Sequence, residues 1–295
     1  MNLALRNGVL LALIAAVFWG VSGTLGQFLF HERGVEVKWL ITIRLLLSGI
    51  LLLAYGLFRK SPGLWKIWKD KKSILGLVTF SVTGITAVQY TYFEAIHHSN
   101  AATATVLQYL GPVLIAIFLS VKYKQLPSKL NTIAILLAVI GTYLLVTHGD
   151  FRQLTITPTA LIFGLASAVT LAIYTLQPIA LLNKYGAMPV LSWGMLIGGI
   201  LFSFISPPWS VSGYWDLSAL LSVAFIIVFA TAVAFLFYLN AVQLIGAQKS
   251  SLLASAEPLA ATILAVIWLQ VPFGWLDWIG SICIISTVFL LSRKE

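Results

Sequence analysis

The chain has 295 residues, of which 60% are hydrophobic and 9% are charged, whereas a soluble domain has about 45–50% apolar and about 25% charged residues. Its 18 basic and 9 acidic residues cannot cover the surface of a soluble protein, which excludes a soluble enzyme, a nucleic-acid-binding protein and a disordered chain. Apolar runs of about 18 residues or more recur, as in membrane-spanning helices, and they lack the alternation of membrane-barrel strands. The one cysteine, Cys283, excludes an intrachain disulfide.

The apolar pattern predicts an all-α membrane protein with ten transmembrane helices. The connectors between them are short, so no room is left for a soluble domain. In chain order the predicted spans are 7–30, 37–58, 74–96, 101–121, 130–147, 158–182, 189–205, 217–239, 250–269 and 274–291.

The basic residues are distributed unequally between the two sides of the predicted membrane protein. On the side of the N-terminus the connectors and chain ends hold 14 of the 18 lysines and arginines, and the other side holds only Arg33, Lys38 and Arg152. Because positive residues favour the cytoplasmic side, this bias predicts a cell-membrane protein with both termini in the cytoplasm. The segment 65–72 mixes tryptophan with lysine and is expected to contact membrane lipids at the inner surface.

An internal repeat relates the two halves of the sequence. Residues 94–145 align without a gap on 240–291 at an offset of 146, and this register pairs Pro112 with Pro258 inside corresponding spans. Each half then holds five spans. Because five is odd, the second half crosses the membrane in the opposite sense. Inverted repeats of this kind place a substrate site near the membrane midplane between the halves.

Short motifs in both halves connect the chain with a known family. They are Trp19-Gly20, the segment 99–102 leading into Pro112, and Gly246-Ala247 leading into Glu257-Pro258. With ten spans in two halves, the chain resembles the EamA-type members of the drug/metabolite transporter superfamily. The resemblance implies that 1–147 and 158–291 are two EamA-like five-helix repeats, the second inverted. It also implies transport of a small metabolite such as an amino acid or amine, frequently outward.

Glu257 is the first candidate for the transport chemistry. It lies about 10 Å into its span, directly before Pro258, which disfavours helix at that point. Pro112 and Pro178 are expected to break two other spans in the same way. Broken helices near the midplane are where transporters bind substrates and coupling ions, so Glu257 is a candidate for proton coupling and for binding a cation. The alternative is a structural carboxylate bonded to a neighbouring helix.

Two further charges inside spans, Arg44 and Glu94, are predicted to form a structural ion pair, because they lie at similar depth on neighbouring antiparallel helices. Lys249 either borders an inner vestibule or extends its amine to the lipid headgroups. The remaining polar and aromatic side chains of the spans should face inward, where rings suit amines through cation–π contact. The expected lining of the substrate site is Trp19, Gln89, Tyr90, Gln108, Tyr109, Tyr174, Gln177, Trp193, Tyr238 and Glu257.

Two other functions stay open at this point. An uncoupled facilitator or channel would use the same cavity. An intramembrane enzyme would need a nucleophile such as Ser22 with a base in reach, but the four histidines, His31, His97, His98 and His148, fall at predicted outer ends. No metal site, cofactor or nucleic acid is expected. The sequence identifies neither the substrate nor the oligomeric state.

Overall fold

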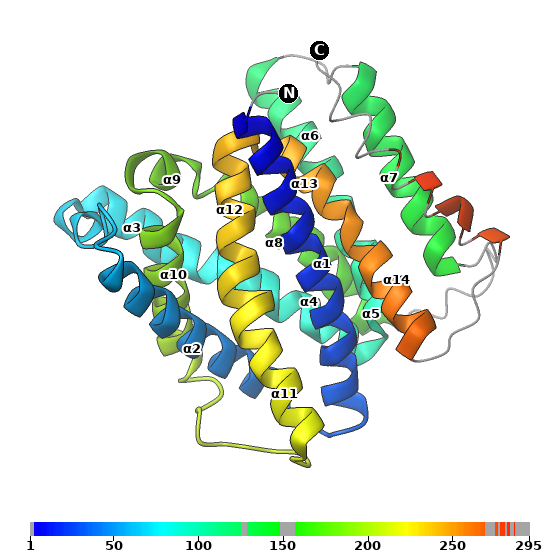
Figure 1. Cartoon of the computed structure of the whole chain (residues 1–295), viewed down its shortest axis with the longest axis horizontal. Coiled ribbons are helices and arrows are strands. Elements are labelled where there is room, and N and C mark those ends of the chain that lie inside the picture. The colour runs from blue at the N-terminus through cyan, green and yellow to red at the C-terminus, as the bar shows by residue number, and fades with distance from the viewer. Residues whose placement is uncertain are drawn as a thin grey trace.

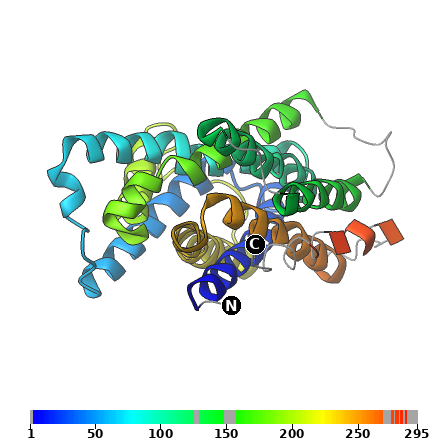
Figure 2. The same cartoon turned by 90° about the horizontal axis from the view of Figure 1, so that it is seen from above.

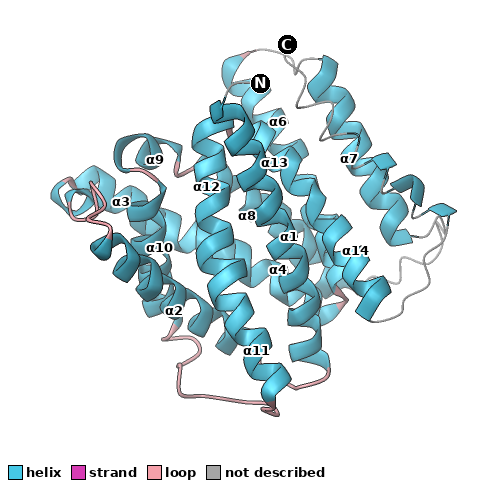
Figure 3. Ribbon diagram, viewed as in Figure 1, coloured by secondary structure: helices cyan, strands magenta, loops and turns pink. Residues whose placement is uncertain are grey.

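The computed structural model describes residues 3–124, 129–147 and 157–268, together with 275–276, 278–280, 282–283 and 286. Every regular element within these residues is a helix (Figure 3). The predicted tenth span, 274–291, lies mostly outside the described residues, as does His148.

Five helical stretches are long and apolar enough to cross a membrane. Two are single helices, α1 (Leu3–His31) and α2 (Val37–Phe58). The other three are composite: α3 (Lys71–Thr79), η2 (Phe80–Thr86) and α4 (Ala87–His98); α8 (Pro158–Leu176) and α9 (Ile179–Tyr185); and α11 (Leu217–Phe225), η3 (Ile226–Val233) and α12 (Ala234–Ile245). Both η2 and η3 are π-helical, a form that often occurs at functional sites.

The remaining helices are shorter. They are η1 (Lys66–Lys69), α5 (Ala101–Gln108), α6 (Leu110–Tyr123), α7 (Lys129–Thr147), α10 (Ala187–Phe202), α13 (Ala247–Leu253), η4 (Ala254–Ala256) and α14 (Glu257–Trp268). The helices therefore cover the first nine predicted spans. Among the described residues, only the five stretches named above are long and apolar enough for a full crossing.

Local sequence explains where these helices begin and break. Asp70 caps α3, because its carboxylate accepts a hydrogen bond from the Lys72 backbone N–H at 3.1 Å. The predicted helix-breaking prolines lie at interruptions: Pro112 follows the break between α5 and α6, Pro178 separates α8 from α9, and Pro258 is the second residue of α14. The first turn of a helix tolerates a proline, because an N–H at that position would have no partner within the helix.

The helices are arranged around α1, which packs between α12 and α14 (Figure 1). Behind α1, α4 packs against α8. On one side α2 lies along α10, and on the other α5, α6 and α7 form a group (Figure 2). One continuous apolar core joins α1, α2, α4, α8, α10 and α12, and their outer faces carry exposed apolar side chains, as expected for lipid contact.

Glycines allow the closest helix contacts. A Cβ atom at Gly49 of α2 would lie 2.6 Å from the Leu196 nitrogen of α10, and one at Gly199 of α10 would lie 2.8 Å from the Leu46 nitrogen of α2. Small residues at such interfaces let backbones approach and are typical of membrane helices.

Two connections meet at one end of the bundle. The loop after α1 contacts the loop between α10 and α11, and both lie at the bottom of Figure 1. Arg33 Nη2 and Asp216 Oδ2 form an ion pair at 3.0 Å, and the Tyr214 N–H donates to the Arg33 carbonyl at 2.7 Å. These contacts join the first and second parts of the chain at that end.

Candidate functional site

A central cavity lies between α1, α2, α4, α5, α8, α12 and the segment α13–η4–α14. Its lining residues come from both parts of the chain. They are Trp19, Ser22, Arg44, Val88, Gln89, Tyr92, Phe93, Gln108, Tyr109, Leu171, Tyr174, Phe235, Ser251, Ala254 and Glu257.

Glu257 forms the acidic side of this cavity and is 4% exposed. Its carboxylate accepts a hydrogen bond from the Tyr92 hydroxyl at 3.0 Å, and the Tyr109 hydroxyl lies 3.3 Å from its second oxygen. It is the first residue of α14, directly after the 3₁₀ turn η4. The partial positive charge of a helix N-terminus stabilises a carboxylate at this position.

The break between α5 and α6 places Tyr109 in the cavity. Tyr109 lies between the two helices, and its hydroxyl also donates to the Ala254 carbonyl of η4. Two helix interruptions therefore face each other, one before Pro112 and one before Pro258. Their contact brings Gln108 and Tyr109 to the same cavity as Glu257.

Arg44 forms the basic side of the cavity and is 2% exposed. Its Nε atom donates to the Thr231 hydroxyl at 2.9 Å, and its Cζ atom lies 4.6 Å from the centroid of the Phe93 ring. The Thr231 hydroxyl in turn donates to the Ile226 carbonyl, five residues earlier, at 2.7 Å. The π-helical segment η3 thus fixes the acceptor that orients Arg44.

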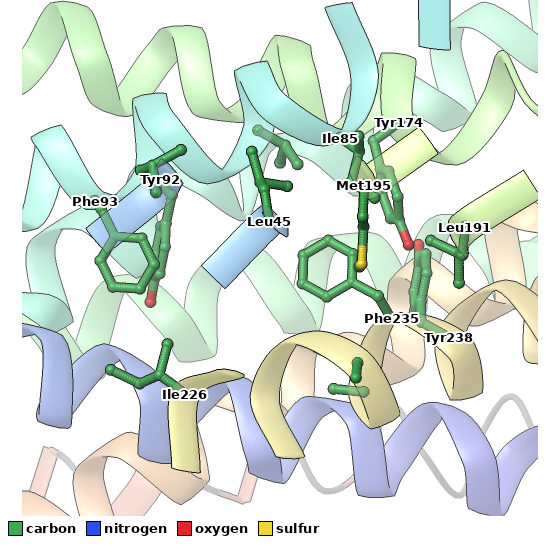
Figure 4. Packing of buried hydrophobic residues seen from close by; sticks show 14 of the residues in the cluster. Leu45, Ile85, Tyr92, Phe93, Tyr174, Leu191, Met195, Ile226, Phe235 and Tyr238 are labelled. Atoms are coloured by element: carbon green, nitrogen blue, oxygen red, sulfur yellow. The ribbon is translucent and has the colours of Figure 1, made fainter. Parts of the chain in front are cut away.

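The same π-helical segment also fixes Trp19. The indole N–H of Trp19 donates to the Ala230 carbonyl of η3 at 3.1 Å, and its ring packs against Phe235 at a centroid distance of 5.1 Å. Tyr174 lies stacked on Tyr238, with ring centroids 5.9 Å apart (Figure 4). Trp19, Tyr174 and Phe235 therefore form an aromatic wall of the cavity.

Six of the ten residues expected to line the substrate site do line this cavity: Trp19, Gln89, Gln108, Tyr109, Tyr174 and Glu257. The other four belong to the surroundings, as their contacts show. Tyr238 lies behind Tyr174, with its hydroxyl 3.0 Å from Thr175.

The remaining three lie elsewhere. Tyr90 packs on Phe202, Gln177 donates to the Gly76 carbonyl at 3.0 Å, and Trp193 packs against the two tryptophans of the 65–72 segment. These four side chains are therefore not among the residues that line the central cavity in this structure.

The structure gives Arg44 and Glu94, the expected ion pair, different partners. Among the described residues Arg44 bonds Thr231, whereas Glu94 lies 3.6 Å from His98, one turn along α4. Both charges are buried, but adjacent residues of a helix point about 100° apart. Phe93 faces Arg44, so the Glu94 side chain leaves the helix in a different direction. Matched depth alone does not make a pair.

Tyr92 is one of the lining residues that the sequence reasoning missed, and it bonds Glu257 directly. It contacts both Glu257 and Thr105, and its ring is buried. The signal that would have found it is its spacing of three residues from Gln89, since residues three and four apart share a helix face.

A second cavity of about 410 Å³ lies near the α1–α2 loop and the end of α4. We call it the outer cavity; it is lined by Phe30, Gly34, Val35, Glu36, Val37, Lys38, Glu94, His97 and His98. No group of three potential metal ligands occurs within the described part of the chain. The central cavity, at about 50 Å³, is much smaller than the roughly 300–1,000 Å³ of typical ligand pockets.

Comparison with known proteins identifies the family. The model of the EamA-like transporter family matches residues 6–147 and 158–293. The chain belongs to the EamA-like transporter family. It is therefore a multi-pass helical membrane protein and a transporter, as the sequence motifs indicated.

Several relatives align with most of this chain. The Salmonella typhimurium protein named "Uncharacterized inner membrane transporter YicL" is 40% identical over 291 residues, covering 97% of this chain and 95% of the relative. The "Threonine/homoserine exporter RhtA" of Salmonella typhimurium is 24% identical, covering 88% and 83%. A solved crystal structure matches the fold with a TM-score of 0.76 at 17% identity, over 97% of this chain and 96% of that one.

Proposed function

We propose that this transporter is a secondary transporter that exports a small metabolite, an amino acid or amine, from the cytoplasm by alternating access around the central cavity. The observation that carries the proposal is Glu257: a buried carboxylate at a helix interruption, bonded by Tyr92 and near Tyr109. Transporters place binding sites at such interruptions.

The proposed architecture is ten membrane helices in two inverted five-helix repeats, 1–147 and 158–291. Helix bounds support this architecture, because three pairs of helices begin 146 residues apart. Their first residues are Lys71 and Leu217, Phe80 and Ile226, and Ala101 and Ala247. Each proposed half has one π-helical segment in the middle of a long stretch. The 14-to-3 distribution of basic residues favours both termini in the cytoplasm.

Alternating access requires the two halves to move against each other around the site. The cavity supports this, because Gln89 and Tyr92 come from the first half, and Phe235, Ser251 and Glu257 come from the second. Its volume of about 50 Å³ is too small for an amino acid or amine, since ligand pockets measure roughly 300–1,000 Å³. Binding therefore needs a wider conformation, which a relative motion of the halves would supply.

Glu257 is the proposed site of proton coupling. Tyr92 has one hydroxyl proton and two neighbours that accept it, Glu257 at 3.0 Å and Thr105 at 2.9 Å. An ionised Glu257 takes this hydrogen bond, whereas a protonated Glu257 can donate to Tyr92, which then donates to Thr105. A substrate ammonium group and a proton compete for one carboxylate, and such competition exchanges inward protons for outward substrate.

The chemistry of the cavity and the named relatives support the proposed substrate class. Glu257 attracts an ammonium group, and the rings of Trp19 and Tyr174 add cation–π contact and apolar surface. One relative carries the name of a threonine/homoserine exporter, and another that of an inner membrane transporter. We therefore place this chain in the inner cell membrane with outward transport of an amino acid or amine.

The alternatives have less support. An enzyme built on Ser22 needs a base, and no histidine is among the described residues that line the cavity. An uncoupled facilitator would use the same cavity without Glu257 changing its protonation.

Flux measurements with purified protein in sealed proteoliposomes test the proposal. Labelled L-threonine is the probe, and vesicles are compared with and without a pH gradient. Accumulation that depends on the gradient supports a proton-coupled transporter. Equilibration without accumulation under any gradient would identify a facilitator, and absence of flux for a panel of amino acids and amines would overturn the substrate class.

A further inference from the structure

The central cavity contains a cation whose hydrogen-bonding capacity is incompletely used. Arg44 is 2% exposed and donates through Nε to Thr231, but its Nη1 atom has no hydrogen-bond partner among the described residues. A buried charged donor without an acceptor is costly, so it normally faces a partner or a ligand.

Gln89 has the same property. It is 3% exposed, lines the same cavity, and neither its amide nitrogen nor its amide oxygen has a partner within the described part of the chain. An amide has two donors and an acceptor to satisfy. Two neighbouring helices, α2 and α4, thus present unused donors to one small space.

Glu257 gives this space an opposite charge. Arg44 and Glu257 both line the cavity, yet no ion pair or hydrogen bond joins them among the described residues. Glu257 instead accepts a hydrogen bond from Tyr92, which lies on the same helix as Gln89. A ligand with a negative group near a positive group would neutralise both buried charges. A simple amine would satisfy Glu257 alone.

We propose that Arg44 and Gln89 form a carboxylate-binding subsite that makes the transporter selective for zwitterionic α-amino acids over the corresponding amines. This inference rests on the proposed function. Arg44 Nη1 and the Gln89 amide nitrogen donate to the substrate carboxylate, and Glu257 accepts from its ammonium group. Trp19, Leu171 and Phe235 give the cavity an uncharged lining that suits an uncharged side chain.

Arginine is suited to this role because its planar guanidinium offers several donors in a fixed geometry. Here the stacking on Phe93 and the bond to Thr231 hold the guanidinium in place before the ligand arrives. A preorganised donor loses little freedom on binding. Lysine at position 44 would keep the charge but lose the Nε bond to Thr231.

Competition experiments with a matched pair of probes test the subsite. L-Threonine and 1-amino-2-propanol, which is threonine without its carboxylate, compete for uptake into proteoliposomes that contain wild-type protein. Because a charge-assisted hydrogen bond is at stake, we expect the amino acid to bind about 10- to 100-fold more tightly than the amine. Arg44→Gln should reduce the ratio of the two affinities to near unity, mostly by weakening the binding of L-threonine. Arg44→Lys should retain part of it.

Gln89→Leu provides a second variant that leaves all charges in place, and we expect an intermediate ratio. Arg59→Gln is the matched control, because this exposed arginine ends α2 far along the helix from Arg44; its ratio should equal that of the wild type. Size-exclusion profiles and thermal unfolding show whether each variant is folded.

The outcomes separate the subsite from the proposed function. Equal affinity of the wild type for L-threonine and 1-amino-2-propanol, with flux present, overturns the carboxylate subsite and leaves the transporter proposal standing. The carboxylate subsite is also overturned if folded Gln89→Leu and folded Arg44→Lys both keep the wild-type ratio of affinities for L-threonine and 1-amino-2-propanol. Absence of flux for amino acids and amines alike overturns the proposed substrate class, and the subsite with it.

Discussion

The hydroxyl of Tyr92 donates a hydrogen bond of 3.0 Å to Glu257, 165 residues later in the chain. This bond joins α4 to the start of α14 at the centre of the molecule, next to the Thr105 hydroxyl. It connects the acidic group of the proposed site with a residue of the other proposed half. A relative motion of the halves must therefore alter the surroundings of Glu257.

Replacing Tyr92 by phenylalanine removes this donor and keeps the ring. We expect Tyr92→Phe to lower the free energy of unfolding by about 1–3 kcal/mol, because a buried carboxylate loses a hydrogen bond, and to reduce transport. Thermal unfolding in detergent and flux into proteoliposomes measure the two effects. Tyr55→Phe is the control, since Tyr55 is 50% exposed on α2; equal effects of the two substitutions would contradict the role given to Tyr92.

Thr231 is expected to act through Arg44. Thr231→Val has nearly the same shape but neither accepts from Arg44 Nε nor donates to the Ile226 carbonyl. We expect a loss of about 1–3 kcal/mol of stability from the unsatisfied buried donor, and weaker binding of amino acids. Thr83→Val is the control, because Thr83 is exposed in the other π-helical segment. Wild-type affinity in folded Thr231→Val would show that Arg44 needs no such support.

Gly20 controls the distance between α1 and α14. A Cβ atom there would lie 2.6 Å from the Glu257 carbonyl oxygen and 2.8 Å from the Ala260 Cβ atom. Gly20→Ala should therefore displace the start of α14 and cost about 1–3 kcal/mol, as overpacking does. The matched control is Gly76→Ala, where the nearest atom, on Leu181, is 3.7 Å away. A stability loss as large in Gly76→Ala would refute the steric explanation.

The ion pair between Asp70 and Lys184 gives a prediction about pH. The Lys184 amine bonds the Asp70 carboxylate at 2.6 Å, and with Ser73 and the Lys72 N–H it lowers the pKa of Asp70 from 3.8 to about 2. A carboxyl group whose pKa is lower in the folded state stabilises the fold at every pH above its unfolded pKa of 3.8. That stabilisation is lost as the pH falls from there towards about 2.

Asp70→Asn keeps a side-chain acceptor for the helix cap but removes the charge that Lys184 contacts. We expect a lower midpoint of thermal unfolding than in the wild type, by an amount that stays constant between about pH 5 and pH 8 because Asp70 is ionised throughout. Unfolding curves across that range measure it. A difference that disappears below about pH 6 would contradict the pKa assignment.

Much of this molecule could be predicted from the sequence. The bounds of α2 equal those of the predicted span 37–58, because membrane helices need long apolar runs and short polar connectors mark their ends. Pro112, Pro178 and Pro258 marked interruptions, since proline removes a donor and constrains the preceding residue.

Side-chain direction was harder to predict. Depth along a helix follows from counting residues, but direction around its axis depends on unbroken α-helical geometry. The π-helical segment η2, at Phe80–Thr86, precedes Gln89 and Tyr92 in the same stretch and changes the number of residues per turn. The face that α4 presents therefore cannot be extrapolated from α3.

The asymmetry between the halves also has a packing reason. Gly111 occupies the repeat position that corresponds to Glu257. A Cβ atom at Gly111 would lie 2.9 Å from the Leu171 side chain of α8. In the proposed repeat, the first half thus uses this position for helix contact, and the second half uses it for a carboxylate.

The central claim is that Glu257 is the shared site of proton and substrate. Glu257→Gln mimics the protonated side chain at nearly constant size and tests this claim most directly, with Glu94→Gln as the control for a buried glutamate that lies in the outer cavity. Both variants are reconstituted, and the uptake of labelled L-threonine is measured with and without a pH gradient. We predict that Glu257→Gln weakens substrate binding and abolishes accumulation driven by the gradient, whereas Glu94→Gln keeps both. Unchanged binding and unchanged accumulation in folded Glu257→Gln would contradict the account.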